Sequence, residues 1–560
     1  MVRENRVANF LAAALVTLLL AACATSGGES KPEESLPVAT EVTPLEDTAE
    51  NCAGTFVAHT LDHTTTVPGG DQVRNFEANG SGVAINDLDN DGDLDIVLGN
   101  HAGSNTILWN EGGLDYRVER MEVGDTRLVT IVDLDGDGWL DILLTRTGSA
   151  PNYWHNDAAV QPGRRTFTQH PLPAVGKPLY TANWGDLDGD GDLDMVGATY
   201  DAGLLDDFGV DFLMSGNAGV YYYENEGGEF SETRLSSGAQ ALTIILLDLN
   251  QDGQLDVMVG NDFAVFDQAW VRANGEWEEW PSLETTTHST MSFDLGDVDN
   301  DGAFELFASD MKPYVNDAET AAAWQPVLRA LLSDAHPEGD PQLSENMFQV
   351  RGRDGVWHNE AIARGLEATG WSWSSKFGDL DQDGFLDLYV VNGMIELTTL
   401  GHLANHELVE ENQVLKNDGA GSFEPMPDWG LGAVESGRGM SMADLDGDGD
   451  LDIIVNNLRA QARLFENQLC QGSSLQVDLF WPGSGNSRGL GARLALHTSE
   501  GTAYRQVKAA SGYLSGDAAR VHFGLAEGTQ PDWLEIRWPE GKVSMVEDLE
   551  RGTLLSITRE

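Results

Sequence analysis

The chain has 560 residues, of which 92 are acidic and 32 basic, and its formal net charge is -60. This acidity excludes the basic faces that nucleic-acid binders need, and it argues against adhesion to anionic lipid by charge. A hydrophobic content of 41% still allows large cores, and the length allows two or more domains.

Residues 1–22 predict a signal peptide, because two arginines precede an apolar run of 16 residues at 7–22. The run ends in "LAAC" and resembles a bacterial lipoprotein signal, in which Cys23 becomes the lipidated first residue. A short membrane helix is the alternative, although 16 residues are marginal for spanning a bilayer. Since Ala24 rather than Asp follows the cysteine, the resemblance implies an exported lipoprotein at the outer membrane or cell surface of a Gram-negative bacterium.

Residues 23–50 comprise the cysteine and a stretch rich in Ser, Gly, Glu, Pro and Thr. This composition predicts a flexible, solvated tether with a typical reach of about 30 Å. The lipid would then be the only contact with the membrane.

A nine-residue pattern, first spelled "DLDNDGDLD", recurs through most of the chain. Positions 1, 3, 5 and 9 are Asp, Asn or Glu, position 6 is Gly, and position 8 is Leu or Phe. A spacing of about 60 residues predicts a solenoid, a propeller or an array. The seven copies, numbered here in chain order, lie at 87–95, 133–141, 186–194, 248–256, 297–305, 379–387 and 444–452.

The clustered carboxylates of each copy predict a bound cation. Two like charges about 4 Å apart repel by about 4 kcal/mol at a surface-like effective dielectric. Oxygen-only ligands in a flexible loop favour Ca²⁺ over Mg²⁺, and the glycine allows the positive φ that wraps the loop round the ion. Position 7 varies freely, as expected if only its backbone carbonyl binds, and position 8 should anchor the loop in the core.

Up to seven Ca²⁺ ions are therefore expected. The predicted ligands, at positions 1, 3, 5, 7 and 9, are Asp87, Asp89, Asp91, Asp93, Asp95, Asp133, Asp135, Asp137, Trp139, Asp141, Asp186, Asp188, Asp190, Asp192, Asp194, Asp248, Asn250, Asp252, Gln254, Asp256, Asp297, Asp299, Asp301, Ala303, Glu305, Asp379, Asp381, Asp383, Phe385, Asp387, Asp444, Asp446, Asp448, Asp450 and Asp452.

Two other interpretations of the copies fit the sequence less well. Asp-rich turns without metal are possible for one copy, since Asp and Gly favour turns, but the offsets repeat seven times. A helix–loop–helix calcium site would need a Glu at position 12 and flanking helices. Each copy is instead followed by a short apolar run such as "IVLGN" or "LYVVN", which predicts a buried strand.

Four predicted strands accompany most copies, one before the loop and three after it. Seven repeats of four strands predict an all-β fold, a seven-bladed β-propeller over 51–471. The repeats resemble FG-GAP/VCBS repeats, as in the α-subunit propeller of integrins, where the cation loop joins strands one and two of a blade.

The last repeat stops after its third strand, "ARLFEN", so the ring needs another strand to close. Residues 54–61, "GTFVAHTL", are strand-like and precede the first repeat, and they would supply the outer strand of the last blade. Closure would bring Cys52 and Cys470 together, and a disulfide is favoured over two free thiols in an exported protein.

Residues 472–560 lack the aspartate code and alternate with period 2, which predicts a small antiparallel β-sandwich. The spellings "GLGARL", "SGYLS", "RVHFGL" and "IRWPEGKV" resemble the ASPIC/UnbV domain. Together with the propeller, they resemble the cartilage acidic protein family in its bacterial lipoprotein branch. Gly516 departs from the Gln that is frequent in that family, which puts a role for this position in doubt. The resemblance implies no catalytic mechanism.

Long insertions at 199–219, 308–344 and 393–412 follow second strands, so they should lie on the face opposite the cation loops. The candidate ligand-binding residues on that face are Tyr200, Asp207, Tyr314, Trp324, His402 and His406. The two histidines would share one helix face and could bind a transition metal, but an exposed helix with incidental histidines is favoured. "GWSWSS" at 370–375 is read as blade core in preference to a sugar-stacking site.

These features predict a calcium-binding surface lipoprotein that binds an unknown protein or glycan. A calcium-dependent polysaccharide lyase or hydrolase, with its site on the opposite face, is the alternative, and a passive surface protein is a third. The sequence lacks HExxH and a nucleophilic cysteine, so no catalytic residue is predicted and an enzyme is the less favoured interpretation.

Overall fold

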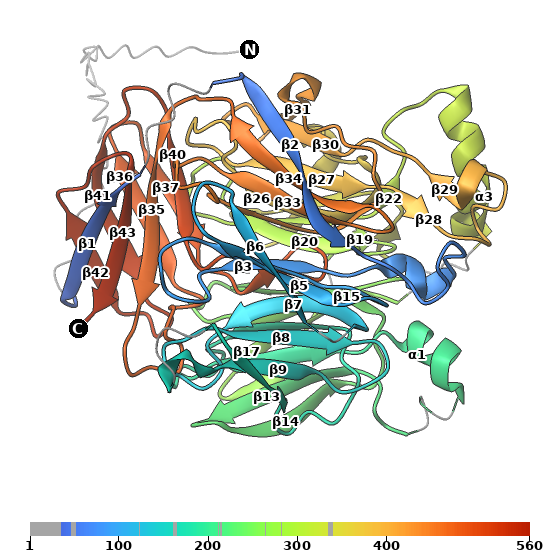
Figure 1. Ribbon diagram of the computed structural model, residues 1–560, viewed down its shortest axis with the longest axis horizontal. Helices are drawn as coiled ribbons and strands as arrows, with labels where there is room; N and C mark the ends of the chain where they lie inside the picture. Colours follow the sequence, from blue (N-terminus) through green and yellow to red (C-terminus); the bar gives the residue numbers. More distant parts are fainter. Residues whose placement is uncertain are drawn as a thin grey trace, which may run out of the picture. The chain divides into compact units, whose positions relative to one another are not determined.

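A computed structural model of the chain describes residues 35–45, 52–121, 124–160, 165–210, 212, 215–263, 265–281, 283–333 and 340–560. Strands dominate these residues, and the predicted all-β, propeller-like fold is confirmed (Figure 1). None of the helices within these ranges combines the length and hydrophobicity that crossing a bilayer demands. The predicted signal and Cys23 lie outside the described residues.

Within the described ranges, seven sheets each contain four antiparallel strands that are neighbours in the sheet, and each sheet holds one acidic loop. Sheet 1 has β3 (Val83–Asn86), β4 (Asp95–Leu98), β5 (Asn105–Asn110) and β6 (Tyr116–Met121). Sheet 2 has β7 (Thr126–Val132), β8 (Asp141–Arg146), β9 (Asn152–Asn156) and β10 (Phe167–Pro171). Sheet 3 has β11 (Thr181–Gly185), β12 (Asp194–Ala198), β13 (Val220–Glu226) and β14 (Glu229–Ser236). Sheet 4 has β15 (Ala241–Leu247), β16 (Asp256–Asn261), β17 (Gln268–Ala273) and β18 (Glu276–Trp280).

Sheets 5 to 7 follow the same order. Sheet 5 has β20 (Ser292–Gly296), β21 (Glu305–Ser309), β24 (Met347–Arg351) and β25 (Trp357–Asn359). Sheet 6 has β26 (Gly370–Gly378), β27 (Asp387–Asn392), β30 (Gln413–Asn417) and β31 (Phe423–Pro425). Sheet 7 has β32 (Gly437–Ala443), β33 (Asp452–Asn457), β34 (Gln461–Gln468) and, as its outer strand, β2 (Thr55–Thr64).

The first strand of each sheet contacts the first strand of the next, and β32 contacts β3, so the sheets form a closed ring. Apolar side chains from facing sheets fill the spaces between neighbours, for example Ile85 and Ile96 against Ile454. The first strands are buried on both faces, which explains their rows of β-branched and aliphatic residues.

The ring closes where the sequence predicted. β2 pairs antiparallel with β34, with Thr55 opposite Gln468, and so completes sheet 7. Cys52 and Cys470, just outside these strands, form a disulfide with their Cα atoms 5.6 Å apart.

The C-terminal residues form two four-stranded sheets, and most of their core residues belong to one large cluster. One sheet has the order β1 (Val38–Pro44), β43 (Thr553–Arg559), β35 (Ser473–Phe480) and β40 (Val521–Leu525). The other has the order β37 (Thr502–Gln506), β36 (Arg493–Thr498), β41 (Pro531–Arg537) and β42 (Val543–Glu547).

The prediction of a flexible tether at 23–50 is wrong for β1. Residues 38–44, "VATEVTP", pair along their whole length with β43 and form an edge strand of the C-terminal sheet. Their alternating β-branched residues suit a strand, but an edge strand that buries little apolar surface gives only a weak signal in the sequence.

A hairpin of β38 (Ala510–Ser511) and β39 (Ser515–Gly516) leaves the C-terminal sheets and enters the middle of the ring. Its backbone and side chains form hydrogen bonds with every sheet, either with the first strand or with the residues just before it. For example, Leu514 O accepts Val129 N at 3.3 Å, Gly512 N donates to Phe293 O at 2.7 Å, and Met440 N donates to the Ser515 hydroxyl at 3.1 Å. The C-terminal region is therefore interlocked with the ring.

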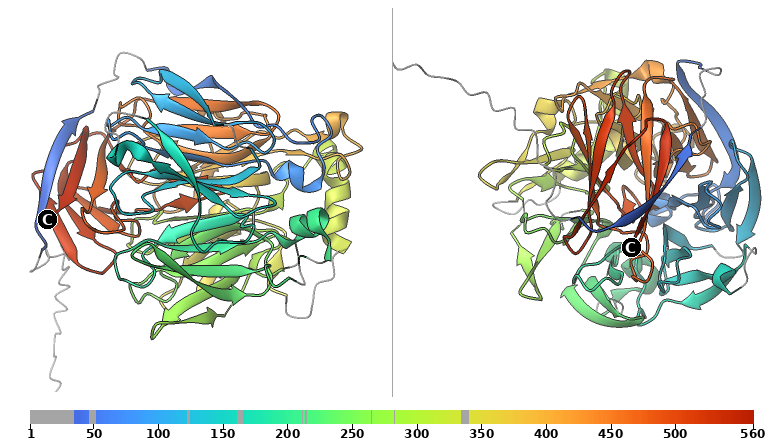
Figure 2. Two further views of the ribbon diagram at one scale, coloured as in Figure 1. Left: turned by 60° about the horizontal axis from the view of Figure 1, so that its bottom comes forward. Right: turned by 90° about the vertical axis from the view of Figure 1, so that its left-hand side faces the viewer.

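The long insertions carry the main helices and three short strand pairs. These elements are α1 (Asp201–Phe208), β23 (Gln342–Leu343) paired with β19 (Thr286–Thr287), β22 (Met311–Lys312) paired with β26, α3 (Ala318–Ser333) and β28 (Met394–Ile395) paired with β29 (Glu407–Leu408). The short helix α4 (Ala361–Arg364) lies outside the insertions, between β25 and β26. In Figure 1 and in the left view of Figure 2, α1 and α3 lie at the end of the ring away from the C-terminal strands.

Candidate metal sites and the opposite face

All seven acidic loops join the first and second strands of a sheet, and position 9 is the first residue of the second strand. The glycines at position 6 have φ between 88° and 103°, the left-handed region expected from the sequence. Position 4 also has positive φ in every copy, for example 55° at Asn90 and 63° at Gln251. Position 4 is Asn, Gln or Gly in every copy, and this restriction was the sequence signal for a second turn that the nine-residue pattern did not include.

Backbone N–H groups shape each loop around its carboxylates. The residue at position 2 donates to the carboxylate at position 9 in all seven copies, as Leu88 N does to Asp95 Oδ2 at 3.1 Å. The glycine at position 6 donates to the carboxylate at position 1, as Gly92 N does to Asp87 Oδ2 at 3.0 Å. The carboxylates are thereby held facing one another, which is costly without a cation.

Burial and mutual repulsion act on these carboxyl groups. Burial, with smaller contributions from neighbouring aspartates, raises the pKa of Asp95 to about 8 and that of Glu305 to about 9. Burial and the nearby Asp383 and Asp381 raise the pKa of Asp379 to about 8. The protein groups around these carboxylates therefore compensate their charge poorly, and a bound divalent ion would favour their charged form.

The donor set fits a hard cation. In five copies, one buried carboxylate oxygen accepts no hydrogen bond from any described residue; these are Asp89 Oδ1, Asp186 Oδ2, Asp299 Oδ1, Asp381 Oδ1 and Asp450 Oδ1. Three carboxylates of a copy bring oxygens within 4.8 Å of one another, as in Asp87, Asp89 and Asp95. Oxygens that are buried, clustered and unbonded are what Ca²⁺ coordination requires.

Three copies already hold a lysine or arginine side chain; in copy 4 this is Arg493, whose guanidinium lies 3.3 Å from Asp248 Oδ2. Lys416, on the third strand of sheet 6, binds Asp381 and lies 2.8 Å from Asp383 Oδ2. Arg165 binds Asp89 and lies 3.1 Å from Asp91 Oδ2 in copy 1. In copy 2, the imidazole Nδ1 of His155 lies 3.3 Å from Asp141 Oδ1. The copies are therefore not equivalent, although the nine-residue code makes them look so.

Sequence reasoning missed an asparagine at the end of the third strand. Asn156 N donates to Asp141 Oδ1 at 2.7 Å, and its side-chain amide donates to Leu140 O and, at 2.8 Å, to Leu88 O in the preceding sheet. Asn110, Asn417 and Asn467 make the same links. The recurring "WN", "HN", "KN" and "EN" after third strands was the available signal.

The C-terminal region covers the loop side of the ring and contributes polar contacts to it. Gln476 donates to Asp444 Oδ2 at 2.6 Å, Arg520 to Gly92 O at 3.1 Å, and Arg488 to Asn90 Oδ1 at 2.6 Å. The loops thus lie at an internal interface, where metal binding and domain packing affect each other.

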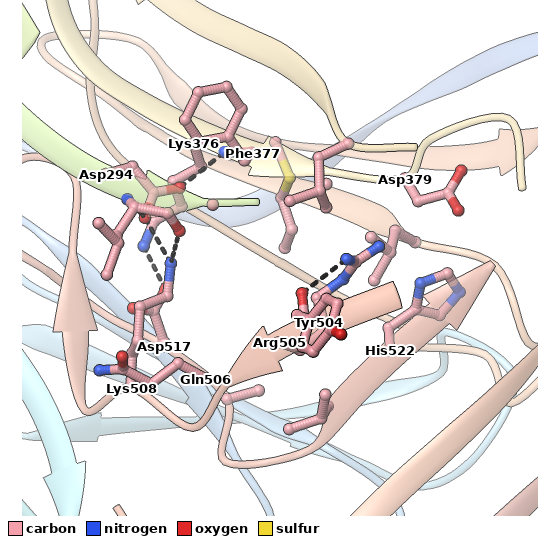
Figure 3. Close-up of a pocket in the computed structure, with 18 of the residues that line it drawn as sticks. Asp294, Lys376, Phe377, Asp379, Tyr504, Arg505, Gln506, Lys508, Asp517 and His522 are labelled. Carbon is pink, nitrogen blue, oxygen red and sulfur yellow. Dashed lines mark hydrogen bonds and ion pairs between the residues drawn. The ribbon is translucent and has the colours of Figure 1, made fainter. Parts of the chain in front are cut away.

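A pocket of about 120 Å³ at this interface contains alternating charges (Figure 3). Lys376 binds Asp517 and donates to the Ser511 hydroxyl at 2.7 Å, and Lys508 binds Asp294. Burial raises the pKa of Asp517, but Lys376 and Lys508 outweigh it and hold that pKa below its ordinary value. These paired charges lock the base of the hairpin to sheets 5 and 6.

The candidate ligand-binding residues lie on the insertions at the end of the ring away from the acidic loops, but not all are accessible. Trp324 is fully buried, and its indole donates to Glu410 Oε1 at 3.0 Å. Tyr200 is also mostly buried, whereas Asp207 is exposed and Tyr314 is half-buried. A cavity of about 420 Å³ lies beside Tyr314, between α3 and residues 403–410.

His402 and His406 do not share a helix face. A single 3-10 turn covers Ala404–His406, and His406 has a positive φ of 55°. His402 contacts Ala323 O at 2.9 Å. "GWSWSS" lies in β26, where Trp373 is buried and donates to Gly393 O at 2.8 Å, in agreement with the core reading.

Comparisons with known proteins identify both regions. The family model "FG-GAP-like repeat" matches residues 133–197 and 403–455, and the model "ASPIC and UnbV" matches residues 483–560. The chain carries FG-GAP-like repeats and an ASPIC and UnbV domain. These matches agree with the resemblance found in the sequence, and the second places the ring-filling hairpin within the ASPIC and UnbV domain.

Several solved structures are similar to the chain at low sequence identity. BBS1N in complex with ARL6DN has 10% identity and a TM-score of 0.41, covering 74% of this chain and 96% of that chain. Saccharomyces cerevisiae Sqt1 has 10% identity and a TM-score of 0.38, covering 69% and 84%. The V. cholerae biofilm matrix protein Bap1 has 12% identity and a TM-score of 0.28, covering 93% and 64%. No curated protein matches the chain.

Proposed function

We propose that this protein is a calcium-binding lipoprotein of the cell surface that uses the ring face opposite the acidic loops to bind a protein or glycan. The observation that carries the calcium role is the set of buried, unbonded carboxylate oxygens in five of the seven copies. Positions 1, 3, 5 and 9 and the carbonyl of position 7 would hold each ion, with Ca²⁺ supplying the compensating charge.

The ligand-binding role rests on the arrangement of the insertions. They extend from a rigid ring, on the face that the C-terminal domain leaves open, and a cavity of about 420 Å³ lies among them. Recognition surfaces are commonly built from loops on such scaffolds. The surface location and lipidation rest on the N-terminal sequence.

Metal content and thermal unfolding of the purified full-length protein test the calcium role. In millimolar calcium we expect several ions per chain, and each site adds about 2.7 kcal/mol of stability when free calcium exceeds its dissociation constant 100-fold. A protein that stays ion-free and melts unchanged after chelation would refute the calcium role. Asp444→Asn should remove one ion, and Asp428→Asn, an exposed change outside the loops, should remove none.

Two further experiments address the surface role. Metabolic labelling with fatty acid should mark the wild type and not Cys23→Ala. Glycan-array or pull-down binding should be lost when residues 308–344 are shortened, while calcium content stays unchanged. Turnover of acidic polysaccharides would instead support the enzymatic alternative and contradict the proposed binding role.

A further inference from the structure

A second cavity, of about 300 Å³, lies at the mouth of the ring on the side away from the acidic loops. Its walls come from residues that precede first strands, lie in the first strand β26 or follow second strands, so five sheets contribute to it. Its base lies near the tip of the C-terminal hairpin, because Tyr513 donates to the carbonyl of Asn79, which lines the cavity.

Aromatic and thioether side chains form most of the wall. Phe76 packs edge-on against Tyr200 with ring centres 5.4 Å apart, and Phe263 lies 6.4 Å from Tyr200. Trp371 and Trp373 complete the aromatic part, and three methionines also line the cavity. One face of Trp373 is covered by the guanidinium of Arg438 at 4.1 Å, so Trp373 can offer a ligand only its other face.

The polar groups of the cavity are acidic. Asp262 and Glu396 line it, and no Lys or Arg occurs among the described lining residues. Tyr200 donates to Asp262 Oδ2 at 2.6 Å, which holds the carboxylate against the aromatic wall. Behind them, the buried Asp310 accepts backbone N–H groups from His288 and Ser289 on one oxygen and from Met311 on the other.

One donor of the wall also lacks an acceptor. The side chain of Trp371 is mostly buried, and its indole N–H has no hydrogen-bond partner among the described residues. A ligand oxygen would satisfy this donor.

We propose that this cavity binds a small organic cation, an alkylated or methylated ammonium compound that also carries a hydroxyl or ether oxygen. Aromatic faces attract such a cation through their quadrupoles, and the nearby carboxylates add Coulomb attraction. An anionic ligand is disfavoured by the same charges. A neutral sugar would need more hydrogen-bonding groups than this mainly apolar wall provides.

The proposal deepens the ligand-binding role proposed above and does not depend on calcium. The probe is choline, and its matched control is 3,3-dimethylbutan-1-ol, which has the same shape and hydroxyl but no charge. Calorimetric titration of the full-length protein should show choline binding at least about tenfold more tightly than the neutral alcohol, within the range of a desolvated cation–π contact. Equal affinities, or no binding of either compound at millimolar concentration, would overturn the proposal.

Two variants locate the site. Asp262→Asn keeps an acceptor for Tyr200 but removes the charge, and Phe263→Leu removes an exposed aromatic ring. Both should reduce the preference for choline severalfold, whereas Asp428→Asn and Phe208→Leu, exposed residues outside the cavity, should not. If the two cavity variants and the two control variants show the same preference for choline, the cation binds elsewhere and the proposal fails. Calcium content measured on the same samples separates this failure from failure of the calcium role.

Discussion

Lys416→Met should create a calcium site in copy 6. The lysine ammonium binds Asp381 and lies 2.8 Å from Asp383 Oδ2, so it occupies the place where these carboxylates would bind a calcium ion. An ion about 4 Å from this charge would be repelled by about 8 kcal/mol, twice the value for unit charges at an effective dielectric near 20. Extracellular calcium sites with dissociation constants of about 10⁻⁴–10⁻³ M bind with only about 4–5.5 kcal/mol.

The repulsion therefore exceeds the free energy of calcium binding. Copy 6 should bind calcium only if the Lys416 side chain moves away from both Asp381 and Asp383. Methionine keeps the apolar stem and removes the charge, so the variant should hold one more ion per chain than the wild type in millimolar calcium. The assay is metal analysis after equilibrium dialysis, together with calorimetric titration.

The matched control is Lys312→Met, which removes a lysine that binds Glu345 at 2.8 Å on the β21–β24 connection, outside the acidic loops. It should leave the ion count unchanged. Adding Asp379→Asn to Lys416→Met should remove the gained ion. Equal ion counts in the wild type and Lys416→Met would refute the view that this lysine decides the occupancy of copy 6.

Three other changes probe the closure and the interlocking of the ring. Replacing both Cys52 and Cys470 with Ser should lower the free energy of unfolding by about 2–4 kcal/mol in denaturant titrations, an effect that reductant should reproduce in the wild type. Asn156→Ala leaves buried carbonyls of two sheets without a hydrogen-bond donor. It should lower the free energy of unfolding by about 1–3 kcal/mol for each carbonyl in denaturant titrations. An effect under about 1 kcal/mol would contradict the role of Asn156 as a link between sheets. Lys376→Met alone should destabilise by about 3–5 kcal/mol because Asp517 stays buried and loses a partner, whereas adding Asp517→Leu should restore part of that loss in a double-mutant cycle. Since the pKa of Asp517 is held below 3.8, its contribution to stability is complete above pH 3.8 and should be lost as the pH falls further.

The repeat code was predictable because its physics is local. Alternating carboxylates, a glycine with positive φ and a following apolar strand occupy nine consecutive residues, so one sequence window contains the whole loop. Closure by β2 was also predictable, because a missing strand at one end of the repeats matched a spare strand at the other. The differences between the copies were not predictable, because Lys416 and His155 lie on third strands, more than ten residues away from their loops in the sequence.

The position of the hairpin shows the limit of sequence reasoning most clearly. "SGYLS" could be assigned to the C-terminal domain, but its partners come from all seven sheets and share no motif. Val129, Phe293 and Met440 bond to it through backbone atoms, which any side chain would permit. Gly516 packs against Ala84, and a Cβ there would come within 2.8 Å of the Ala84 Cβ. The presence of glycine where the family frequently has Gln therefore has a steric cause in this chain. With the backbone in this position, the centre of the ring has no room for a larger residue.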